Sequence, residues 1–180
     1  MTDTPRTPPT PQAHHPTTAT IIVDTREQLP YSFTTPGVTT IRGTLQTGDY
    51  SLQGYESRIA VERKTLDDFV GSVTRSRARF LREMTRLAAF DARCVVVEAN
   101  WSDVAAKFYR GQVHPASVFG SAVAIIVDHR IPVYFLSTRA IARRFTEKFL
   151  LRYHASVTAA AASAAATAGE DNNAPRGEVP

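Results

Sequence analysis

Residues 48–68 read GDYSLQGYESRIAVERKTLDD, and this stretch decides the fold. It contains two short runs in which apolar residues recur, on either side of a polar segment at 54–57. Glycine, serine and charged residues in such a segment favour a turn, so the pattern predicts two antiparallel strands over 50–53 and 58–64. The stretch therefore predicts a β-hairpin with acidic and basic residues at its open end.

The register of this hairpin brings two carboxylates together. If the turn holds four residues, Leu52 lies opposite Ile59, and the same register places Asp49 opposite Glu62. Directly opposed side chains lie about 4.5–5.5 Å apart at Cβ, where two like charges destabilise a sheet. Side chains alternate between the two faces of a strand, so Lys64 shares the face of Glu62. We therefore expect an aspartate, a glutamate and a lysine to converge.

Such a trio suits the hydrolysis of a phosphodiester bond. Carboxylate oxygens bind a hard cation such as Mg²⁺, which activates water and neutralises charge on a phosphate. An ammonium group beside them orients that water or helps to deprotonate it. The same residue types also occur on solvated hairpins that have no chemical role, so the trio needs support from other parts of the chain.

Outside the hairpin, short β-branched runs alternate with segments of helical spacing. We predict further strands over 20–23, 38–41, 93–98 and 131–136, and helices over 65–73, 76–90, 101–109, 115–129 and 139–154. The first strands are expected to form a meander, and the later strands to alternate with helices. The chain is thus predicted to be an α/β protein with a central mixed sheet flanked by helices.

The chain has the length of one globular domain with two tails. Its 180 residues, of which 43% are hydrophobic, fit a single core. Residues 1–19 are rich in proline and threonine, and residues 155–180 begin as an alanine run and end polar. Both tails are therefore expected to be disordered, with the domain spanning 20–154. The formal net charge is +4, and the tails are acidic on balance, so the domain itself favours a polyanionic partner.

Composition excludes several classes of protein. One cysteine, Cys94, allows no disulfide framework within a monomer and no cysteine-based zinc site. The N-terminus lacks the apolar segment of a signal peptide, and the longest apolar run is far shorter than the roughly 20 residues of a membrane span. We expect a soluble protein of a reducing, cytoplasmic compartment with no membrane partner.

Three motifs follow one another along the chain: IVDTRE at 22–27, GDY at 48–50, and VERK at 61–64 followed by Asp68. Together they resemble the nuclease domain of XPF-type structure-specific endonucleases, in which a GD motif precedes an ERKxxxD motif. The resemblance implies a restriction-endonuclease-like fold over about 20–154. It also implies a homodimer that cleaves branched, flapped or junction DNA with Mg²⁺ or Mn²⁺, in DNA repair or recombination.

The same resemblance assigns metal ligands. It implies that Asp49 and Glu62 bind the cation. Asp24, at the end of an apolar strand, and Glu27, in the same motif, are both candidates for a further ligand. Position in the sequence does not separate these two acids.

The catalytic set implied by the resemblance is Asp49, Glu62, Lys64, Asp68 and Arg63. Four of these residues keep an alternative. Asp49, directly after a glycine, also fits a turn residue, and Lys64 also fits a solvated strand end. Asp68 with Thr65 also fits a helix-capping box, a role that is compatible with a place near the metal. Arg63 is expected on the strand face opposite Lys64, where a structural ion pair is at least as well supported as a contact with DNA.

The predicted helix over 76–90 has a basic side. At 100° per residue, the side opposite its apolar residues collects Arg75, Arg79, Arg82 and Arg86. A charged stripe is usually only a solvated face, but beside a nuclease site it also suits contacts with DNA phosphates. These four arginines are the candidate DNA-binding residues, with a solvated face as the alternative.

The chain departs from larger family members. Relatives commonly carry paired helix-hairpin-helix motifs after the nuclease domain, and none follows residue 154 here. We therefore expect a stand-alone form in which weak DNA binding is helped by a DNA-targeting protein partner. The alternative is a catalytically silent subunit that binds DNA and positions an active nuclease. Silent copies typically lose motif residues, and the complete motifs here favour activity.

A four-residue spacing places Ile141, Phe145 and Phe149 on one side of the predicted helix over 139–154. An apolar ridge of this kind is either part of the core or a contact in a dimer. The spacing alone does not distinguish the two.

Overall fold

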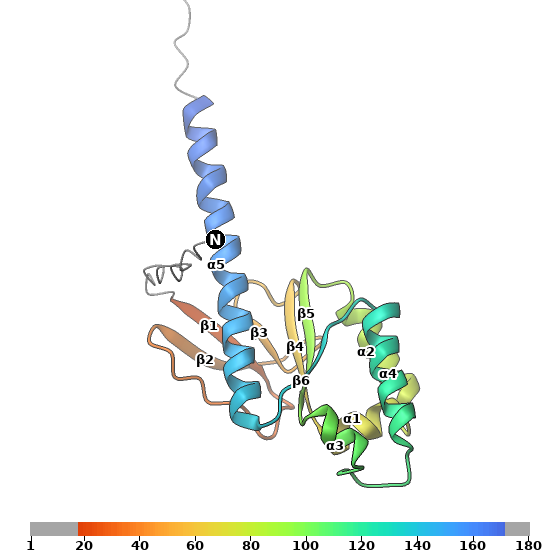
Figure 1. Ribbon diagram of the computed structural model, residues 1–180. Helices are drawn as coiled ribbons and strands as arrows, with labels where there is room; N and C mark the ends of the chain where they lie inside the picture. Colours follow the sequence, from red (N-terminus) through yellow and green to blue (C-terminus); the bar gives the residue numbers. More distant parts are fainter. Residues whose placement is uncertain (1–17, 172–180) are drawn as a thin grey trace, which may run out of the picture.

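The computed structural model describes residues 18–171, apart from a few side chains near the end of the last helix. The predicted N-terminal tail over 1–19 lies almost wholly outside the described residues, as does the polar end of the predicted C-terminal tail. The described chain forms a sheet with helices packed on both faces (Figure 1). This arrangement confirms the predicted α/β class with a central mixed sheet.

The described residues contain six strands: β1 (Ala19–Asp24), β2 (Val38–Gly43), β3 (Tyr50–Leu52), β4 (Ile59–Thr65), β5 (Ala92–Glu98) and β6 (Val133–Phe135). They lie in the order β2-β1-β3-β4-β5-β6. β3 is antiparallel to both of its neighbours, whereas β2 is parallel to β1, and β4, β5 and β6 are parallel to one another. The sheet is therefore mixed.

The predicted meander of the first strands is wrong, because β1 lies between β2 and β3. β1 is buried along nearly its whole length, whereas β2 is rich in threonine and mostly exposed. A strand that is apolar on both faces is stabilised in the middle of a sheet, and a polar strand tolerates the edge. Burial, rather than chain order, therefore sets the topology of this half of the sheet.

The hairpin over 48–68 has the predicted register. Tyr50 pairs with Val61, which is the register that sets Asp49 against Glu62. β3 and β4 are both buried at this point, so the register also keeps their apolar residues in the core. The local pairing is confirmed although the order of the outer strands is not.

Gly48 allows the chain to approach β4 closely just before β3. Its φ is +82°, and a Cβ at this position would lie 2.9 Å from the Cβ of Ala60. The next residue, Asp49, donates its backbone N–H to the carbonyl of Val61 at 2.9 Å. Glycine thus brings the Asp49 carboxylate against β4.

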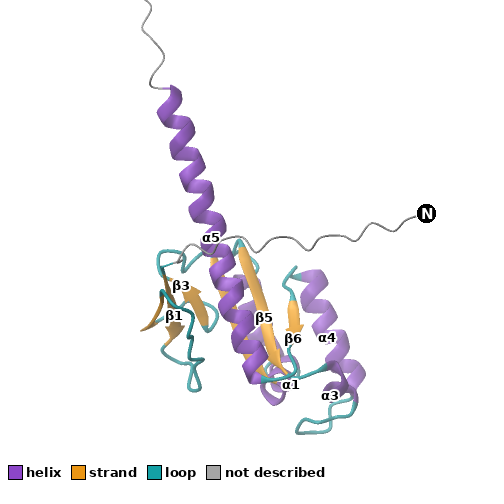
Figure 2. Cartoon of the chain, turned by 60° about the vertical axis from the view of Figure 1, so that its left-hand side comes forward, coloured by secondary structure: helices purple, strands orange, loops and turns teal. Residues whose placement is uncertain are grey.

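The described residues form five helices: α1 (Leu66–Val73), α2 (Arg77–Leu87), α3 (Trp101–Ala105), α4 (Pro115–Asp128) and α5 (Arg139–Asp171). One core cluster packs α1, α2 and α4 against one face of β4 and β5, with Phe69 and Met84 fully buried. The other cluster packs α5 against the opposite face, with Leu150 and Cys94 buried. Figure 2 shows α5 on one side of the sheet and α1, α3 and α4 on the other.

α5 is longer than predicted, because it continues beyond residue 154 to Asp171 through the alanine run. Alanine has the highest helix propensity of the amino acids, so the run extends a helix that tertiary contacts have already started. The described side chains beyond Val157 are all exposed, and this part of α5 projects away from the sheet (Figure 1). The predicted domain boundary itself stays a prediction. Within the described residues, no helix is both long and apolar enough to cross a membrane.

Candidate active site

Glu62 and Lys64 project together from the face of β4 that meets α2. Lys64 Nζ donates a hydrogen bond to Glu62 Oε1 at 2.5 Å, and it lies 5.7 Å from the centre of the Phe80 ring on α2. Both side chains are largely buried, at 18% and 6% exposure for Lys64 and Glu62. The shared face predicted from strand alternation is confirmed.

Asp49 meets this pair from the start of β3. Its Oδ2 accepts a hydrogen bond from the backbone N–H of Arg63 at 2.7 Å. Burial, followed by the negative charge of Glu62, raises the pKa of Asp49 to about 8. Burial also raises the pKa of Glu62, although Lys64 opposes the shift. Both shifts disfavour two charged carboxylates side by side, and a bound cation would relieve this repulsion.

Lys64 remains charged in this environment. Burial alone would lower its pKa, but the charge of Glu62 and the hydrogen bond to it outweigh burial, so the pKa of Lys64 is raised. In this arrangement Lys64 supplies a fixed positive charge and a hydrogen-bond donor.

The donor set fits a hard divalent cation. Among residues 18–171 no three or more histidine, cysteine, aspartate or glutamate side chains are already grouped to hold a metal ion. Mg²⁺, however, usually binds one or two carboxylates and takes its other ligands from water and substrate phosphate. Glu62 is buried and Asp49 is partly buried, and the negative charge of Glu62 raises the pKa of Asp49. They fit Mg²⁺ or Mn²⁺ bound in this way.

Asp24 lies at the end of β1, where contacts within the protein occupy both of its oxygens. They accept hydrogen bonds of 2.7–3.0 Å from the Arg26 backbone N–H, the Arg26 guanidinium and the Leu45 backbone N–H. Burial alone would raise the pKa of Asp24, but these bonds hold it below its ordinary value. Asp24 and Arg26 thus hold the loops after β1 and β2 together.

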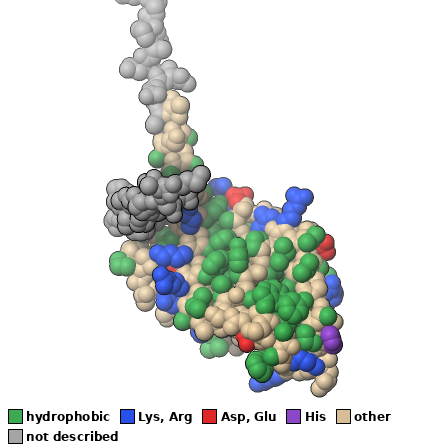
Figure 3. Space-filling model, viewed as in Figure 1, with side chains coloured by type: hydrophobic (Ala, Val, Ile, Leu, Met, Phe, Trp, Pro, Cys, Tyr) green, Lys and Arg blue, Asp and Glu red, His purple; other side chains and the backbone are tan. Residues whose placement is uncertain are grey.

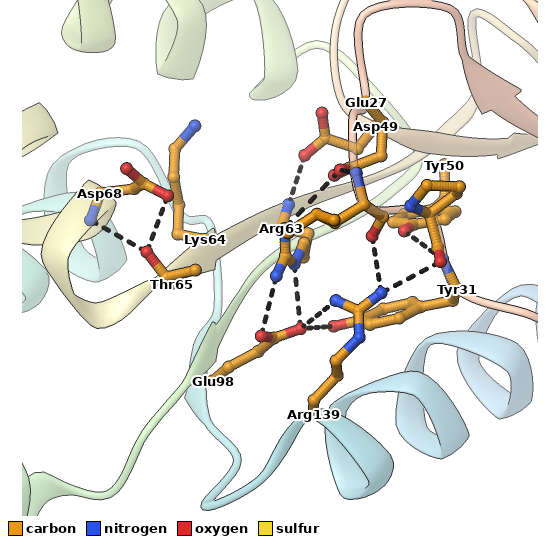
Figure 4. A network of polar contacts seen from close by, with 12 residues as sticks. Glu27, Tyr31, Asp49, Tyr50, Arg63, Lys64, Thr65, Asp68, Glu98 and Arg139 are labelled. Atoms are coloured by element: carbon orange, nitrogen blue, oxygen red, sulfur yellow. Dashed lines mark hydrogen bonds and ion pairs between the residues drawn. The ribbon is translucent and has the colours of Figure 1, made fainter.

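Glu27 lies close to the pair of Asp49 and Glu62, which its position in the sequence did not show. Figure 4 shows its side chain beside Asp49, and its charge adds to the effects of burial and Glu62 on the pKa of Asp49. Glu27 Oε1 accepts a hydrogen bond from the Leu29 backbone N–H at 2.7 Å and lies 3.6 Å from Arg63 Nη1. Of the two acids that the sequence left open, Glu27 has the better access to a cation at Asp49.

Arg63 points away from Lys64, to the opposite face of β4 (Figure 4). Its guanidinium forms a two-point ion pair with Glu98, with distances of 2.8 and 2.9 Å, and its side chain is 8% exposed. The structure thus contains the ion pair that was the alternative to a DNA contact. A direct role of Arg63 on DNA stays a prediction.

Glu98 is the acidic residue at the centre of this network, and the sequence analysis missed it together with its partners Tyr31 and Arg139. It ends β5 and accepts hydrogen bonds from the Tyr31 hydroxyl at 2.8 Å and from Arg139 at 3.2 Å, in addition to those from Arg63. Arg139 begins α5 and also donates to the backbone carbonyls of residues 29 and 30. The sequence did contain one sign of this role, because Glu98 follows the apolar run of β5 directly. The network connects β4, β5, α5 and the loop that carries Glu27.

Asp68 takes part in the helix cap. Its backbone N–H donates to Thr65 Oγ1 at 3.2 Å, and the Thr65 hydroxyl donates in turn to Asp68 Oδ2 at 2.7 Å. Thr65 therefore caps α1 as predicted, but the Asp68 carboxylate accepts from the Thr65 hydroxyl rather than from the Thr65 backbone N–H that a capping box requires. Asp68 lies in the first turn of α1, four residues after Lys64. A role for Asp68 in the reaction stays a prediction.

The four candidate DNA-binding arginines do not share one helix. α2 begins at Arg77, so Arg75 lies in the turn between α1 and α2, and only the other three lie on α2. All four are exposed. A polar cleft of about 250 Å³ between α1 and α2 is lined by two of them, Arg75 and Arg79, together with Gly71 and five further polar residues: Lys64, Asp67, Asp68, Ser72 and Ser76. We call it the α1–α2 cleft.

The predicted apolar ridge on α5 is only partly exposed. Phe145 and Phe149 pack against the core, with the Phe145 and Tyr134 ring centres 4.6 Å apart, whereas Ile141 is exposed. α4 leaves more apolar surface uncovered, through Val123, Ile126 and Val127. Figure 3 shows hydrophobic side chains gathered on this side of the molecule.

A mixed sheet between two helical layers, with buried carboxylates and a lysine beside its central hairpin, defines a restriction-endonuclease-like nuclease domain. This class agrees with the similarity to solved structures described below. The ERCC4 domain matches residues 23–149, and the chain belongs to this family. The resemblance inferred from the three motifs is thereby confirmed.

Two solved structures of XPF from Aeropyrum pernix are similar to this chain. One has 25% sequence identity and a TM-score of 0.57, with 73% of this chain and 59% of that chain covered. The other, a complex with DNA, has 26% identity and a TM-score of 0.56, with 73% and 63% covered. A curated relative from Methanocaldococcus jannaschii, "Putative ATP-dependent RNA helicase MJ1505", is 32% identical over 93 residues, which are 51% of this chain and 10% of the relative. The chain thus spans less than two thirds of each relative.

Proposed function

We propose that this domain is a divalent-metal-dependent endonuclease that hydrolyses phosphodiester bonds at branched, flapped or junction DNA. The observation that carries the proposal is the pairing of the partly buried Asp49 with the buried Glu62, with Lys64 on the same strand face as Glu62. Membership of the ERCC4 family and the similarity to an XPF chain in complex with DNA support the choice of DNA as substrate.

The residues divide the chemistry between them. Asp49 and Glu62 would hold Mg²⁺ or Mn²⁺, with Glu27 beside them. When bound, the cation activates water for attack and compensates charge on the phosphate. Lys64 is charged and already donates to Glu62, so it is placed to hydrogen-bond the attacking water or a phosphate oxygen. Arg63 holds Asp49 through its backbone N–H and contacts Glu98 through its side chain, so it positions the site rather than reacting.

The test is cleavage of labelled flap, fork, Holliday-junction and plain duplex DNA in Mg²⁺, Mn²⁺ or EDTA. We expect cleavage of the branched substrates only with metal, and its loss in Asp49→Asn and Glu62→Gln, since each change removes a ligand charge while nearly keeping shape. Glu56→Gln, on the exposed turn of the same hairpin, is the matched control and should cleave normally. Wild-type rates in either site variant at saturating metal would contradict the ligand assignment. DNA binding without any cleavage would instead favour the silent subunit.

We also propose that the domain acts as a homodimer, as the resemblance implies, with a DNA-targeting protein as a further partner. The exposed apolar side chains of α4 support a protein contact on this side. An exposed apolar patch of adjacent side chains commonly marks a protein interface.

A further inference from the structure

The α1–α2 cleft opens directly beside the candidate active site. Lys64 lines this cleft and also hydrogen-bonds Glu62, so one side chain belongs to both places. The cleft follows the turn between α1 and α2, where Ser72 lies in the last turn of α1 and Ser76 directly precedes α2. Anything bound in the cleft would therefore lie next to the atoms that react.

The shape of the cleft brings a guanidinium against α1. A Cβ at Gly71 would lie 3.2 Å from Arg75 Nη2, so the missing side chain leaves room for Arg75 to lie over this helix. Arg79, on the first turn of α2, lines the same cleft. The Ser76 hydroxyl makes no capping hydrogen bond to α2 and is available to a ligand.

The charges of the cleft favour an anion. Within the described residues, neither Arg75 nor Arg79 forms an ion pair with an acidic side chain. Two acids, Asp67 and Asp68, also line the cleft, but both have partners: Asp67 accepts from the Arg110 backbone N–H at 2.7 Å, and Asp68 accepts from the Thr65 hydroxyl at 2.7 Å. Two guanidinium groups without an ion pair among the described residues, in a cleft that also has the hydroxyls of Ser72 and Ser76 in its lining, are donors that suit a phosphate group.

We propose that the α1–α2 cleft binds one backbone phosphate of the cleaved DNA strand, immediately beside the phosphate that is hydrolysed. This inference rests on the proposed function, because the two phosphates would be held by one continuous strand across Lys64. Arg75 and Arg79 are the positioning residues for that strand. Arg82 and Arg86 lie further along α2 and do not line the cleft. Only two of the four arginines of the predicted stripe are therefore expected to contact this phosphate.

The arginines that do not line the cleft provide a matched control for those that do. Arg75→Gln/Arg79→Gln and Arg82→Gln/Arg86→Gln each remove two exposed positive charges from the same region, and glutamine retains helix propensity. We expect the first variant to bind fluorescent flap DNA in EDTA about tenfold more weakly than the second. Thermal unfolding checks that both variants are folded. Restoring the charges as Arg75→Lys/Arg79→Lys should recover part of the affinity.

A set of oligonucleotides locates the contact. Each carries a single neutral methylphosphonate at one position of the labelled strand, and affinity is measured by fluorescence anisotropy in EDTA. For the wild-type protein, one position should weaken binding about tenfold, and Arg75→Gln/Arg79→Gln should be insensitive to that position. Arg82→Gln/Arg86→Gln should keep the wild-type loss. The proposal is overturned if no position is sensitive, if the sensitivity persists in Arg75→Gln/Arg79→Gln, or if both double variants lose it equally.

This readout is independent of catalysis. If the wild-type protein binds but does not cut DNA in Mg²⁺ or Mn²⁺, the proposed function fails while the phosphate subsite is still measured. If it cuts DNA, the position of the cut is mapped as a second test. The proposal then requires that the sensitive phosphate lies directly next to the cleaved phosphate. A sensitive phosphate several nucleotides away would overturn the proposed position of the strand.

Discussion

Arg63 contacts Glu98 through its guanidinium and Asp49 through its backbone N–H, so one residue joins the two faces of β4. Burial alone would raise the pKa of Glu98, but the hydrogen bonds from Arg63 and Tyr31 hold it below its ordinary value. The stabilisation by Glu98 is therefore present near neutral pH and is lost as the pH falls through its lowered pKa.

Glu98→Gln tests this network. The substitution leaves the buried guanidinium of Arg63 with only the more distant Glu27 carboxylate, at 3.6 Å, as a countercharge, and breaking a buried pair costs about 3–5 kcal/mol. We expect urea unfolding at pH 7 to show a loss of roughly this size, and cleavage to fall because Asp49 is less firmly held. Glu56→Gln, an exposed carboxylate on the hairpin turn, should change stability by less than about 0.5 kcal/mol. Unchanged stability in Glu98→Gln would show that the network does not support the site.

At the scale of the element, α5 combines two different segments. Its first half buries Leu150 and Ala142 in the core cluster, whereas its described side chains beyond Val157 are exposed. Helix formation there follows from alanine propensity, and tertiary packing adds nothing to the described part of it.

Removing residues 158–180 should therefore leave the melting temperature within about 2 °C of the intact chain, since little apolar area is lost. Calorimetry or circular dichroism measures the change. Leu150→Ala is the comparison: it deletes a fully buried side chain and should cost about 2–5 kcal/mol of unfolding free energy. A large loss on truncation would mean that the exposed half of α5 has a partner, such as a second copy of the chain.

At the scale of the whole molecule, the side of α4 that faces solvent is the strongest candidate for a contact between copies. Val127 is 66% exposed and Val123 is 55% exposed, whereas Phe145 on α5 is packed against Tyr134. A charge on α4 is therefore a cleaner test of association than a charge on the ridge of α5, where it would also disturb the core.

We expect the wild-type domain to sediment as a dimer and Val127→Glu to sediment as a folded monomer. In an isologous dimer one substitution places two charges in the interface. Thr158→Glu, on the exposed part of α5, is the control and should remain dimeric. A dimer that persists in Val127→Glu would exclude the α4 face, and a monomeric wild type would exclude the homodimer.

Short-range patterns in the sequence predicted the parts of this protein that short-range forces determine. The hairpin register follows from apolar alternation and a four-residue turn, so the pairing of Tyr50 with Val61 could be counted from the chain. The cap formed by Thr65 and Asp68 follows from spacing within one helical turn. The hairpin register and the alternation of side chains along β4 were enough to bring Asp49, Glu62 and Lys64 together before any long-range contact was known.

Only the tertiary structure decided what depends on residues far apart in the chain. It placed β1 between β2 and β3, paired Arg63 with Glu98, and directed Glu27 rather than Asp24 toward Asp49. It also separated Arg75 and Arg79 from the rest of the stripe, because the turn before α2 folds over α1. The spacing of residues along the chain does not predict such contacts. They form because the burial of apolar strands and helices brings together polar groups that are far apart in the sequence, and these groups must then pair.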